Sequence, residues 1–269
     1  MSSATKALQL LSHFSTSRPE IGLSDLSRTA KRDKATTHRY LQSLEEVGFV
    51  EQSPMTRQYR LGPALLQLAQ TREKTVPRKA SAEPILAALA DATGETAHVS
   101  VLSGSTVYSL ASSTSARHST RVVIDLDQFP LHATASGHCT LAFGPSALMD
   151  AIDNDLEAFT DHTISSPHAL KTAIAEVRKT GLGRAIGSFE AEVSSLAAPL
   201  FDKAGGFAGA ISVACVATRF SPAQERIIQQ HLIKASRTLS THWGGTIPPE
   251  VESAWATTLS NAKTLEPSP

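Results

Sequence analysis

The sequence lacks the features that mark secreted and membrane proteins. Only Cys139 and Cys215 are cysteines among its 269 residues, and they stand far apart with no CxxC pair or Cys/His ladder. This spacing excludes a disulfide framework and disfavours a zinc site, so we expect buried thiols and no metal. No run of eighteen apolar residues occurs, and polar side chains interrupt the first nineteen residues too often for a signal-peptide core. We therefore expect a cytoplasmic globular protein with no membrane partner.

Motifs of common enzyme classes are also missing. There is no GxSxG elbow and no phosphate loop of the Gly-Lys-Ser/Thr kind. The stretch "GLGRAIG" spaces its glycines one residue too widely for a dinucleotide fingerprint, and it follows a predicted helix rather than a strand. Glu190 and Glu192 flank Ala191 in a predicted loop, where paired carboxylates are usually solvated. We expect no catalytic residue and no cofactor.

An excess of charge of one sign is absent overall, because 25 basic residues balance 25 acidic residues. The balance hides an asymmetry, since residues 1–79 carry 13 basic and 7 acidic side chains, which leaves 12 and 18 for the remainder. A basic first part attached to an acidic second part predicts two domains, the first of which binds phosphate groups.

The basic part, residues 1–61, has the pattern of a winged helix-turn-helix domain. Apolar residues at helical spacing predict a first helix that ends near Pro19. Leu23 and Leu26 predict a second short helix, with Ser24 as a candidate N-cap. After a third helix, "FVEQ" and "QYRL" alternate on either side of "SPMTR", which predicts a β-hairpin.

The third helix should run from Lys34, behind the capping residue Asp33, to about Val47. On a helical wheel Leu41, Leu44 and Val47 share one side with Thr37 and Tyr40, and this side should pack on the first two helices. The opposite side and the leading end carry short polar and basic side chains that suit a major groove. An ordinary solvated helix face would look similar, but the preceding helix and following hairpin favour DNA binding. The predicted DNA contacts are Ser24, Lys34, Ala35, Thr36, Thr37, His38, Arg39, Tyr40 and Arg57.

Residues 62–79 should form a connector helix and a short joint. Leucines in "PALLQLA" predict the helix, and Pro77 and Pro84 interrupt a longer one, although Pro84 fits the first turn of a following helix. The apolar side chains favour contact between two copies of the chain, and the alternative is a surface helix packed on its own domain.

Residues 80–245 predict an α+β domain. "TAHVSVL", "TVYSLA", "RVVIDL", "SSLAAPLF" and "FAGAISVACV" are typical of strands, "DKAGG" of a turn, and "ASGHCTLAF", "PHALKTAIAEVRKTG" and "SPAQERIIQQHLIKASRTLSTHW" of helices. Consecutive strands with grouped helices favour an α+β layer over a βαβ repeat. Residues 246–269 should be a flexible tail, in which "EVESAWATTL" could form a short helix.

These motifs together resemble the IclR family of bacterial transcriptional regulators. The resemblance runs from about Lys6 to Trp243 through "KALQLLSHF", "GLSDLSRTAKRDKATTHRYLQSLEEVGFVEQ", "YRLGPALLQLA", "GETAHVSVLSGSTVYSL", "PLHATASGHCTLAF" and "KTGLGRAIGSFEAEVSSLAAPLFDKAGGFAGAISVA". It implies a GAF-like domain, with a central antiparallel sheet flanked by helices and a cavity for a small effector. It also implies operator DNA as a partner and a homodimer or homotetramer whose DNA-binding domains pair near the connector.

The effector site is expected around "LHATASGHCTLAF". Small residues at a helix start expose backbone N–H groups to an anion, although close backbone packing would also explain them. The resemblance implies that this segment lines the pocket and that Ser195 holds the position where family members contact the effector through Cys or Ser. The predicted effector residues are Tyr108, Ile124, Ala135, Ser136, Gly137, Val193, Ser195 and Ser212.

The sequence departs from the family pattern beside that site. Gly187 and Ser188 replace consecutive acidic residues, and His138 stands where a lysine or arginine is common, so the pocket mouth should be reshaped. Two interpretations remain open: a ligand-responsive regulator of a catabolic operon that senses a small organic acid or aromatic derivative, and an enzyme with an α+β body whose N-terminal helices mediate assembly. A gel shift with upstream DNA separates them.

Overall fold

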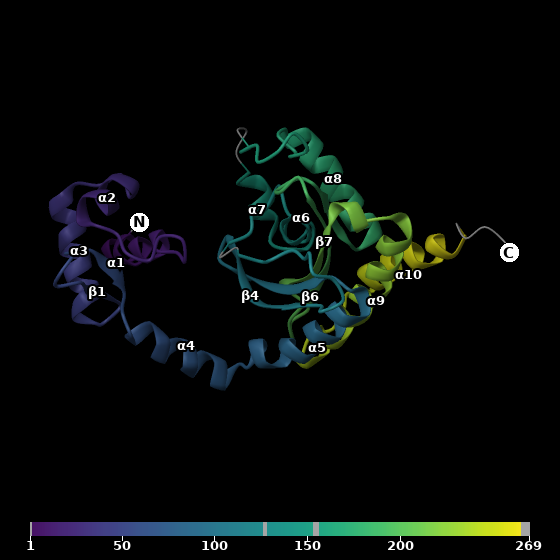
Figure 1. The fold of residues 1–269 in the computed structure, drawn as a ribbon, viewed down its shortest axis with the longest axis horizontal. Helices are drawn as coiled ribbons and strands as arrows, with labels where there is room; N and C mark the ends of the chain where they lie inside the picture. Colours follow the sequence, from purple (N-terminus) through teal and green to yellow (C-terminus); the bar gives the residue numbers. More distant parts are fainter. Residues whose placement is uncertain (1, 126–127, 153–155, 265–269) are drawn as a thin grey trace. The chain divides into compact units, whose positions relative to one another are not determined.

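The computed structural model describes residues 2–125, 128–152 and 156–264, with the backbone alone for residues 261–264. The chain divides into two compact units, Met1–Pro77 and Arg78–Pro269 (Figure 1). The division falls inside the predicted connector, two residues before its expected end. Each unit has its own hydrophobic core.

The first unit has the elements of a winged helix-turn-helix. Helix α1 (Ser3–Leu8) continues as a 3-10 turn (Gln9–His13), and α2 (Leu23–Thr29), α3 (Lys34–Glu46) and the antiparallel pair β1 (Val50–Gln52) and β2 (Tyr59–Leu61) follow. Asp33 caps α3 as predicted, since its carboxylate accepts the Thr36 backbone N–H at 2.8 Å. The core consists of Leu10, Phe14, Ile21, Leu26, Tyr40, Leu41, Leu44, Val50 and Tyr59.

Two details of this unit differ from the sequence prediction. Gly22, and not Ser24, is the N-cap of α2, because the extended backbone already turns helical at Leu23. Val47 is 56% exposed and does not share the buried side of α3. The helix ends at Glu46, and Gly48 takes a left-handed φ of 73°, so the chain leaves the helical wheel before Val47 can pack.

The connector forms helix α4 (Ala64–Thr75), none of whose residues is buried. Leu66 and Leu68 are 67% and 53% exposed. A helix packed on its own domain would bury its apolar stripe, so that alternative does not describe α4.

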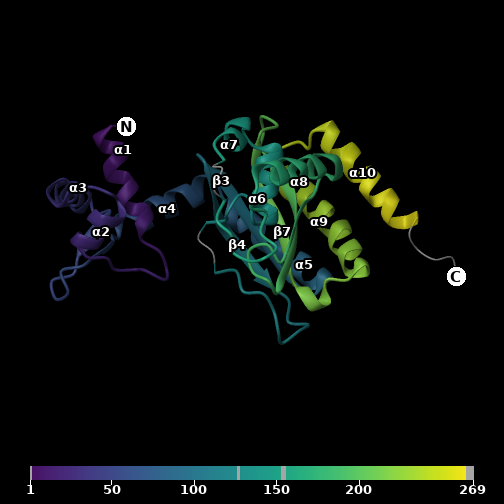
Figure 2. The same ribbon diagram turned by 90° about the horizontal axis from the view of Figure 1, so that it is seen from above.

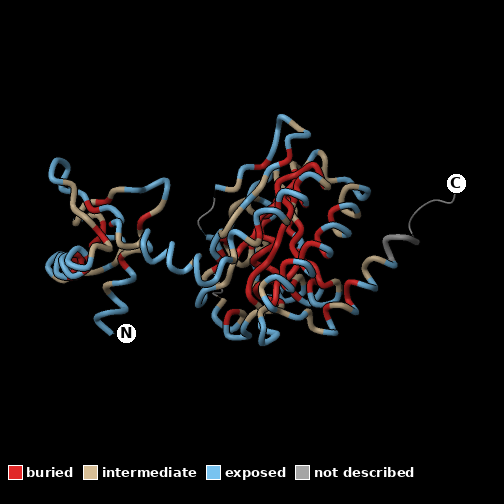
Figure 3. The backbone as a smooth tube through the Cα atoms, turned by 90° about the horizontal axis from the view of Figure 1, so that it is seen from below, coloured by how far each residue is buried: buried red, intermediate tan, exposed pale blue. Residues whose placement is uncertain are grey.

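The second unit is built on a five-stranded antiparallel sheet in the order β4-β3-β7-β6-β5. The strands are β3 (Thr96–Ser103), β4 (Thr106–Thr114), β5 (Gly183–Ile186), β6 (Val193–Phe201) and β7 (Phe207–Val216). Helices α5 (Arg78–Thr93) and α9 (Pro222–His242) cover one face, and α6 (Ala135–Phe143) and α8 (Pro167–Thr180) cover the other (Figure 2). The short α7 (Ser146–Asp150) follows α6, and a 3-10 turn (Ala217–Arg219) precedes α9. Buried segments concentrate in the sheet (Figure 3). The antiparallel sheet with helices on both faces confirms the predicted α+β class.

Two predicted features of this unit are wrong. The stretch "RVVIDL" forms no strand over residues 121–125, and Leu126 lies outside the described residues. Instead, Thr96 Oγ1 donates to the Val122 carbonyl at 2.6 Å, and Val122, Val123 and Ile124 line a cavity. Pro84 lies inside α5 and not in its first turn. The helix already starts at Arg78, and Trp243 contacts its first turn, with Nε1 donating to Ser81 Oγ at 3.0 Å.

The predicted flexible tail is wrong over residues 249–264, whereas the short helix expected in "EVESAWATTL" is confirmed. Residues Pro249–Thr264 form helix α10, which contacts α8 and α9. Trp255 is fully buried and its Nε1 donates to the Gly181 carbonyl at 2.8 Å. The prolines and polar residues suggested a tail, but Trp255 and the buried Val251 supply the apolar face that packs the helix.

Candidate functional site

The candidate DNA-binding surface lies on the first two turns of α3. Lys34, Ala35, His38 and Arg39 are exposed there. The Arg39 guanidinium lies 5.8 Å from the centroid of the Tyr40 ring, so a cation–π contact steadies it against the helix. The Thr36 backbone N–H lowers the pKa of Asp33, which keeps the N-cap charged. This surface combines cations with a fixed helix start, as recognition of phosphates and base edges requires.

Thr37 and Tyr40, two of the predicted DNA contacts, are placed in the core. Thr37 is fully buried and its Oγ1 donates to the Asp33 carbonyl at 2.9 Å. Tyr40 is 9% exposed and packs among the core residues of the unit. A buried side chain cannot reach a DNA groove. Both residues instead hold α3 in place through their packing.

The other predicted DNA contacts lie outside α3. Ser24 is exposed in the first turn of α2. Arg57 is exposed in the hairpin turn with a left-handed φ of 58°. Its backbone N–H donates to the Ser53 carbonyl at 2.9 Å, and its carbonyl accepts from Gln52 Nε2 at 2.9 Å. These bonds fix the turn from which the Arg57 side chain projects.

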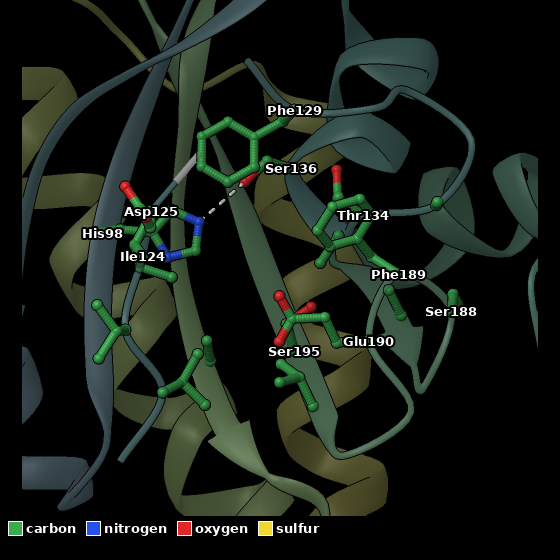
Figure 4. A pocket seen from close by; sticks show the side chains of 17 residues that line it. His98, Ile124, Asp125, Phe129, Thr134, Ser136, Ser188, Phe189, Glu190 and Ser195 are labelled. Carbon is green, nitrogen blue, oxygen red and sulfur yellow. Dashed lines mark hydrogen bonds between the residues drawn. The ribbon is translucent and has the colours of Figure 1, made fainter. Parts of the chain in front are cut away.

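The candidate effector site is a cavity of about 100 Å³ in the second unit. It lies where the sheet meets the start of α6, the segments 122–125 and 188–190, and Phe129 (Figure 4). The lining residues are His98, Val122, Val123, Ile124, Asp125, Phe129, Ala133, Thr134, Ala135, Ser136, Ala185, Ser188, Phe189, Glu190, Val193, Ser195 and Ala214. The lining is mostly apolar with a few polar groups, which is typical of a small-molecule site.

The structure brings five predicted effector residues together at this cavity: Ile124, Ala135, Ser136, Val193 and Ser195. Tyr108 does not line it, because it sits on the edge strand β4, opposite Gln128 and 37% exposed.

Gly137 and Ser212 are buried behind the lining. A Cβ on Gly137 would come within 2.5 Å of the Pro130 and Leu131 carbonyl oxygens, so close packing explains this glycine. Ser212 lies behind Ser136, with the two hydroxyl oxygens 2.7 Å apart. The strand β7 reaches the cavity through Ala214, and not through the predicted Ser212.

The start of α6 offers fewer backbone donors than its small residues suggest. Thr134 is the N-cap, and its Oγ1 accepts the Gly137 N–H at 3.0 Å while donating to the Pro130 carbonyl at 2.8 Å. The N–H groups of Ala135 and Ser136 remain in the first turn, where a helix has no acceptor of its own for them. A ligand acceptor can therefore meet two backbone donors here.

His98 is the main polar residue that the sequence analysis missed. It is 4% exposed, its ring stacks on Phe129 with centroids 5.2 Å apart, and its Nε2 lies 3.5 Å from Ser136 Oγ. Burial lowers the pKa of His98 to about 4, so the imidazole is neutral at physiological pH. The available signal was the alternation in "TAHVSVL", where polar residues at positions 96, 98 and 100 share one face of the strand.

Glu190 and Asp125 line the same cavity. Both residues are exposed, so the expectation that Glu190 is solvated agrees with its placement, but its position at the cavity was not foreseen. The loop that carries Glu190 is the one in which Gly187 and Ser188 replace acidic residues of the family pattern.

His138 is buried and spans two segments near the cavity. Its Nδ1 lies 2.8 Å from the Arg184 carbonyl oxygen and its Nε2 lies 3.0 Å from the His132 carbonyl oxygen. Burial lowers the pKa of His138, and these carbonyl contacts oppose that change. The residue ties the segment before α6 to the edge strand β5, which is a structural task.

The described part of the chain holds no group of three or more His, Cys, Asp or Glu side chains placed to bind a metal ion. Within residues 2–125, 128–152 and 156–264, no helix has both the length and the apolar character needed to cross a membrane. Cys139 and Cys215 are both buried and free, as expected.

Comparison with known proteins gives a consistent assignment. Residues 74–241 match the C-terminal domain of the bacterial transcriptional regulator IclR, and residues 3–54 match the IclR helix-turn-helix domain. The glycerol operon regulatory protein of Streptomyces coelicolor is 30% identical over 220 residues, which cover 79% of this chain and 86% of that protein.

Solved structures agree. A putative IclR transcriptional regulator from Silicibacter sp. TM1040 superposes with a TM-score of 0.89 and 43% identity, covering 93% of this chain and 99% of that one. An IclR homologue from Microbacterium hydrocarbonoxydans, solved with 4-hydroxybenzoate, shares the fold with a TM-score of 0.68 and 22% identity, covering 89% of this chain and 100% of that one. These relatives are regulators and not enzymes, which removes the enzyme alternative. The chain belongs to the IclR family of bacterial transcriptional regulators.

Proposed function

We propose that the protein is a ligand-responsive regulator of a catabolic operon, acting in the cytoplasm as a repressor or an activator. The observation that carries this proposal is the presence, in one chain, of an exposed cationic α3 surface and a separate small-molecule cavity. Lys34, Thr36 and Arg39 would read operator DNA with support from Arg57, and occupation of the cavity would change the population of DNA-competent assemblies.

The proposed active species is a homodimer or homotetramer. Helix α4 buries none of its residues within the chain and exposes Leu66 and Leu68. A second copy of α4 would cover these side chains and pair two DNA-binding units, as two half-sites about one helical turn apart require.

The proposed effector is a small organic acid or a flat aromatic derivative. A cavity of about 100 Å³ is smaller than the engineered cavity of about 150 Å³ that accommodates benzene, which limits the ligand to few heavy atoms in this conformation. The 4-hydroxybenzoate bound to the Microbacterium homologue supports the chemical class of an aromatic acid, and a ligand of that size would require this cavity to widen on binding. Ser195 would contribute a hydroxyl that donates to an acid or accepts from an amide.

A gel shift with the DNA upstream of the protein's own gene tests the proposal. We expect retarded DNA, and a change in its affinity on addition of 4-hydroxybenzoate, short-chain acids or substrates of the neighbouring operon. Ser195→Phe should fill the cavity, retain DNA binding and lose the response. The absence of a shift at micromolar protein and low salt, where non-specific binding alone would be visible, would contradict a DNA-binding role.

A further inference from the structure

The inner end of the cavity holds a chain of polar side chains from three elements. Ser136 Oγ on α6 lies 2.7 Å from Ser212 Oγ on β7 and 3.5 Å from His98 Nε2 on β3. All three residues are buried. Among the described residues His98 Nδ1 is a buried polar atom with no hydrogen-bond partner. Figure 4 shows one ring nitrogen of His98 joined to Ser136 and the other on the side of Ile124, which also lines the cavity.

Counting protons indicates which group donates in each of these hydrogen bonds. A neutral imidazole donates through one nitrogen and accepts through the other. If His98 Nε2 donated to Ser136, one serine hydroxyl would be a buried donor with no recorded acceptor in the described residues, and the Nδ1 lone pair would also stay unpaired. If Ser212 donates to Ser136 and Ser136 donates to Nε2, both hydroxyls are used and Nδ1 is the one group left unpaired, which is the less costly arrangement. The second arrangement leaves the imidazole proton on Nδ1.

His98 therefore presents a buried N–H donor that the described residues leave unsatisfied. Native proteins satisfy most such donors because an unpaired buried group is costly. The ring is stacked on Phe129 with an interplanar angle of 7°, which opposes rotation toward another partner. A carboxylate or sulfonate oxygen in the cavity would accept this proton, and the first-turn N–H groups of Ala135 and Ser136 would assist it.

Apart from the polar side chains at its inner end, the cavity lining carries negative charge. Glu190 and Asp125 contribute carboxylates, and the 17 lining residues include no lysine or arginine. The nearby Arg184 is engaged with Glu225, with Nε 2.9 Å from Oε1. A simple anion would meet two negative groups with no cation to offset them, whereas an ammonium group on the same ligand would be attracted.

We propose that the cavity binds a small zwitterion of the amino-acid or amino-sulfonate class. Its oxyanion accepts from His98 Nδ1–H and the start of α6, and its ammonium group lies at Glu190 and Asp125. The inference rests on the proposed function only in that it takes this cavity as the effector site. His98 and Glu190 are then the residues that determine ligand specificity.

Matched ligand pairs test the proposal directly. Isothermal titration of the full chain would compare β-alanine with propionate, 4-aminobutyrate with butyrate, and 4-(aminomethyl)benzoate with 4-methylbenzoate. We expect the amino member of at least one pair to bind about fivefold or more tightly than its partner, since it gains contacts with two partly exposed carboxylates. Equal or tighter binding of the acids that lack the amino group, or no binding by any amino member, would overturn the proposal.

Variants locate each end of the ligand. Glu190→Gln with Asp125→Asn should reduce the preference for the amino member to within about twofold, whereas Glu192→Gln, an exposed carboxylate outside the lining, should leave it unchanged. His98→Asn keeps an amide N–H near the Nδ1 position and should retain more affinity than His98→Gln, whose amide reaches the Nε2 position. Loss of affinity in both His98 variants with unchanged folding, or no loss in either, would contradict the role given to Nδ1.

Failure of this inference and failure of the proposed function give different results. Operator binding is measured in parallel by fluorescence anisotropy. A protein that binds operator and responds only to acids without an amino group keeps the proposed function and overturns the zwitterion. A protein that binds the amino members with the expected variant pattern but never binds operator supports the zwitterion and contradicts the regulatory role.

Discussion

The two units of the molecule use polar residues in opposite ways. In Met1–Pro77 the candidate functional side chains, among them Lys34 and Arg39, point outward from a helix whose other side is the core. In Arg78–Pro269 the candidate residues, among them His98 and Ser136, are buried inside the fold and depend on partners from distant parts of the chain. A surface that meets DNA needs accessible cations, whereas a site for one small molecule needs desolvated groups of fixed direction.

The largest effect is expected from a substitution in α10, which tests how far the second unit depends on its buried residues. Trp255→Ala removes a fully buried indole and its hydrogen bond to Gly181, so it should destabilise the second unit by about 3–5 kcal/mol. Urea unfolding followed by the fluorescence of Trp243 measures this change. Thr257→Ala, exposed on the same helix, is the control. A decrease of less than about 1 kcal/mol in the free energy of unfolding would instead support the flexible tail that the sequence predicted.

The second test concerns His98 and pH. Its pKa is about 4 in the folded protein and near 6.5 when unfolded, so between these values the unfolded chain binds a proton that the folded chain does not. Stability should therefore fall as pH falls from about 6.5 to about 4, with a loss of up to about 3 kcal/mol from this residue. Urea midpoints of the wild type and His98→Asn, compared at about pH 7.5 and pH 4.5, measure it. Parallel pH profiles for the two proteins would show that His98 is not buried in solution.

A third test addresses the cavity. Ser195→Ala should weaken binding of an accepting ligand by about 0.5–1.5 kcal/mol for a neutral hydrogen bond, because Ser195 lines the cavity with one hydroxyl. Titration with the tightest ligand of the matched pairs measures the change. Ser194→Ala is the control, since Ser194 is buried next to Ser195 and does not line the cavity. Equal affinity in wild type and Ser195→Ala would remove this hydroxyl from the site.

The smallest effect is expected at the hairpin. Arg57→Ala should lower the salt dependence of operator binding by about one unit of slope and leave sequence preference nearly unchanged, as loss of one phosphate contact predicts. Anisotropy titrations across a salt series measure the slope. An altered preference between operator variants would instead assign Arg57 to base readout.

Helical and strand periodicity predicted the fold well but predicted the cavity only in part. The wheel of α3 separated Leu41 and Leu44 from Arg39 because this separation is local to one helix. The cavity depends on sheet register and on an unpaired segment, so His98 and Glu190 could not be linked to Ser195 from spacing alone. The resemblance to a family pointed to Ser136 and Ser195, which line the cavity, whereas the predicted Tyr108, Gly137 and Ser212 lie outside its lining because sequence spacing carries no side-chain direction.

We expect α3 to bind operator DNA and the second unit to make no contact with it. Fluorescence anisotropy with labelled upstream DNA tests it most directly, with Arg39→Ala compared with Lys171→Ala, an exposed cation on α8. If Arg39 contacts a base, Arg39→Ala should weaken specific binding by about 1–3 kcal/mol while Lys171→Ala leaves it unchanged. Unchanged affinity and unchanged salt dependence in Arg39→Ala would contradict the account.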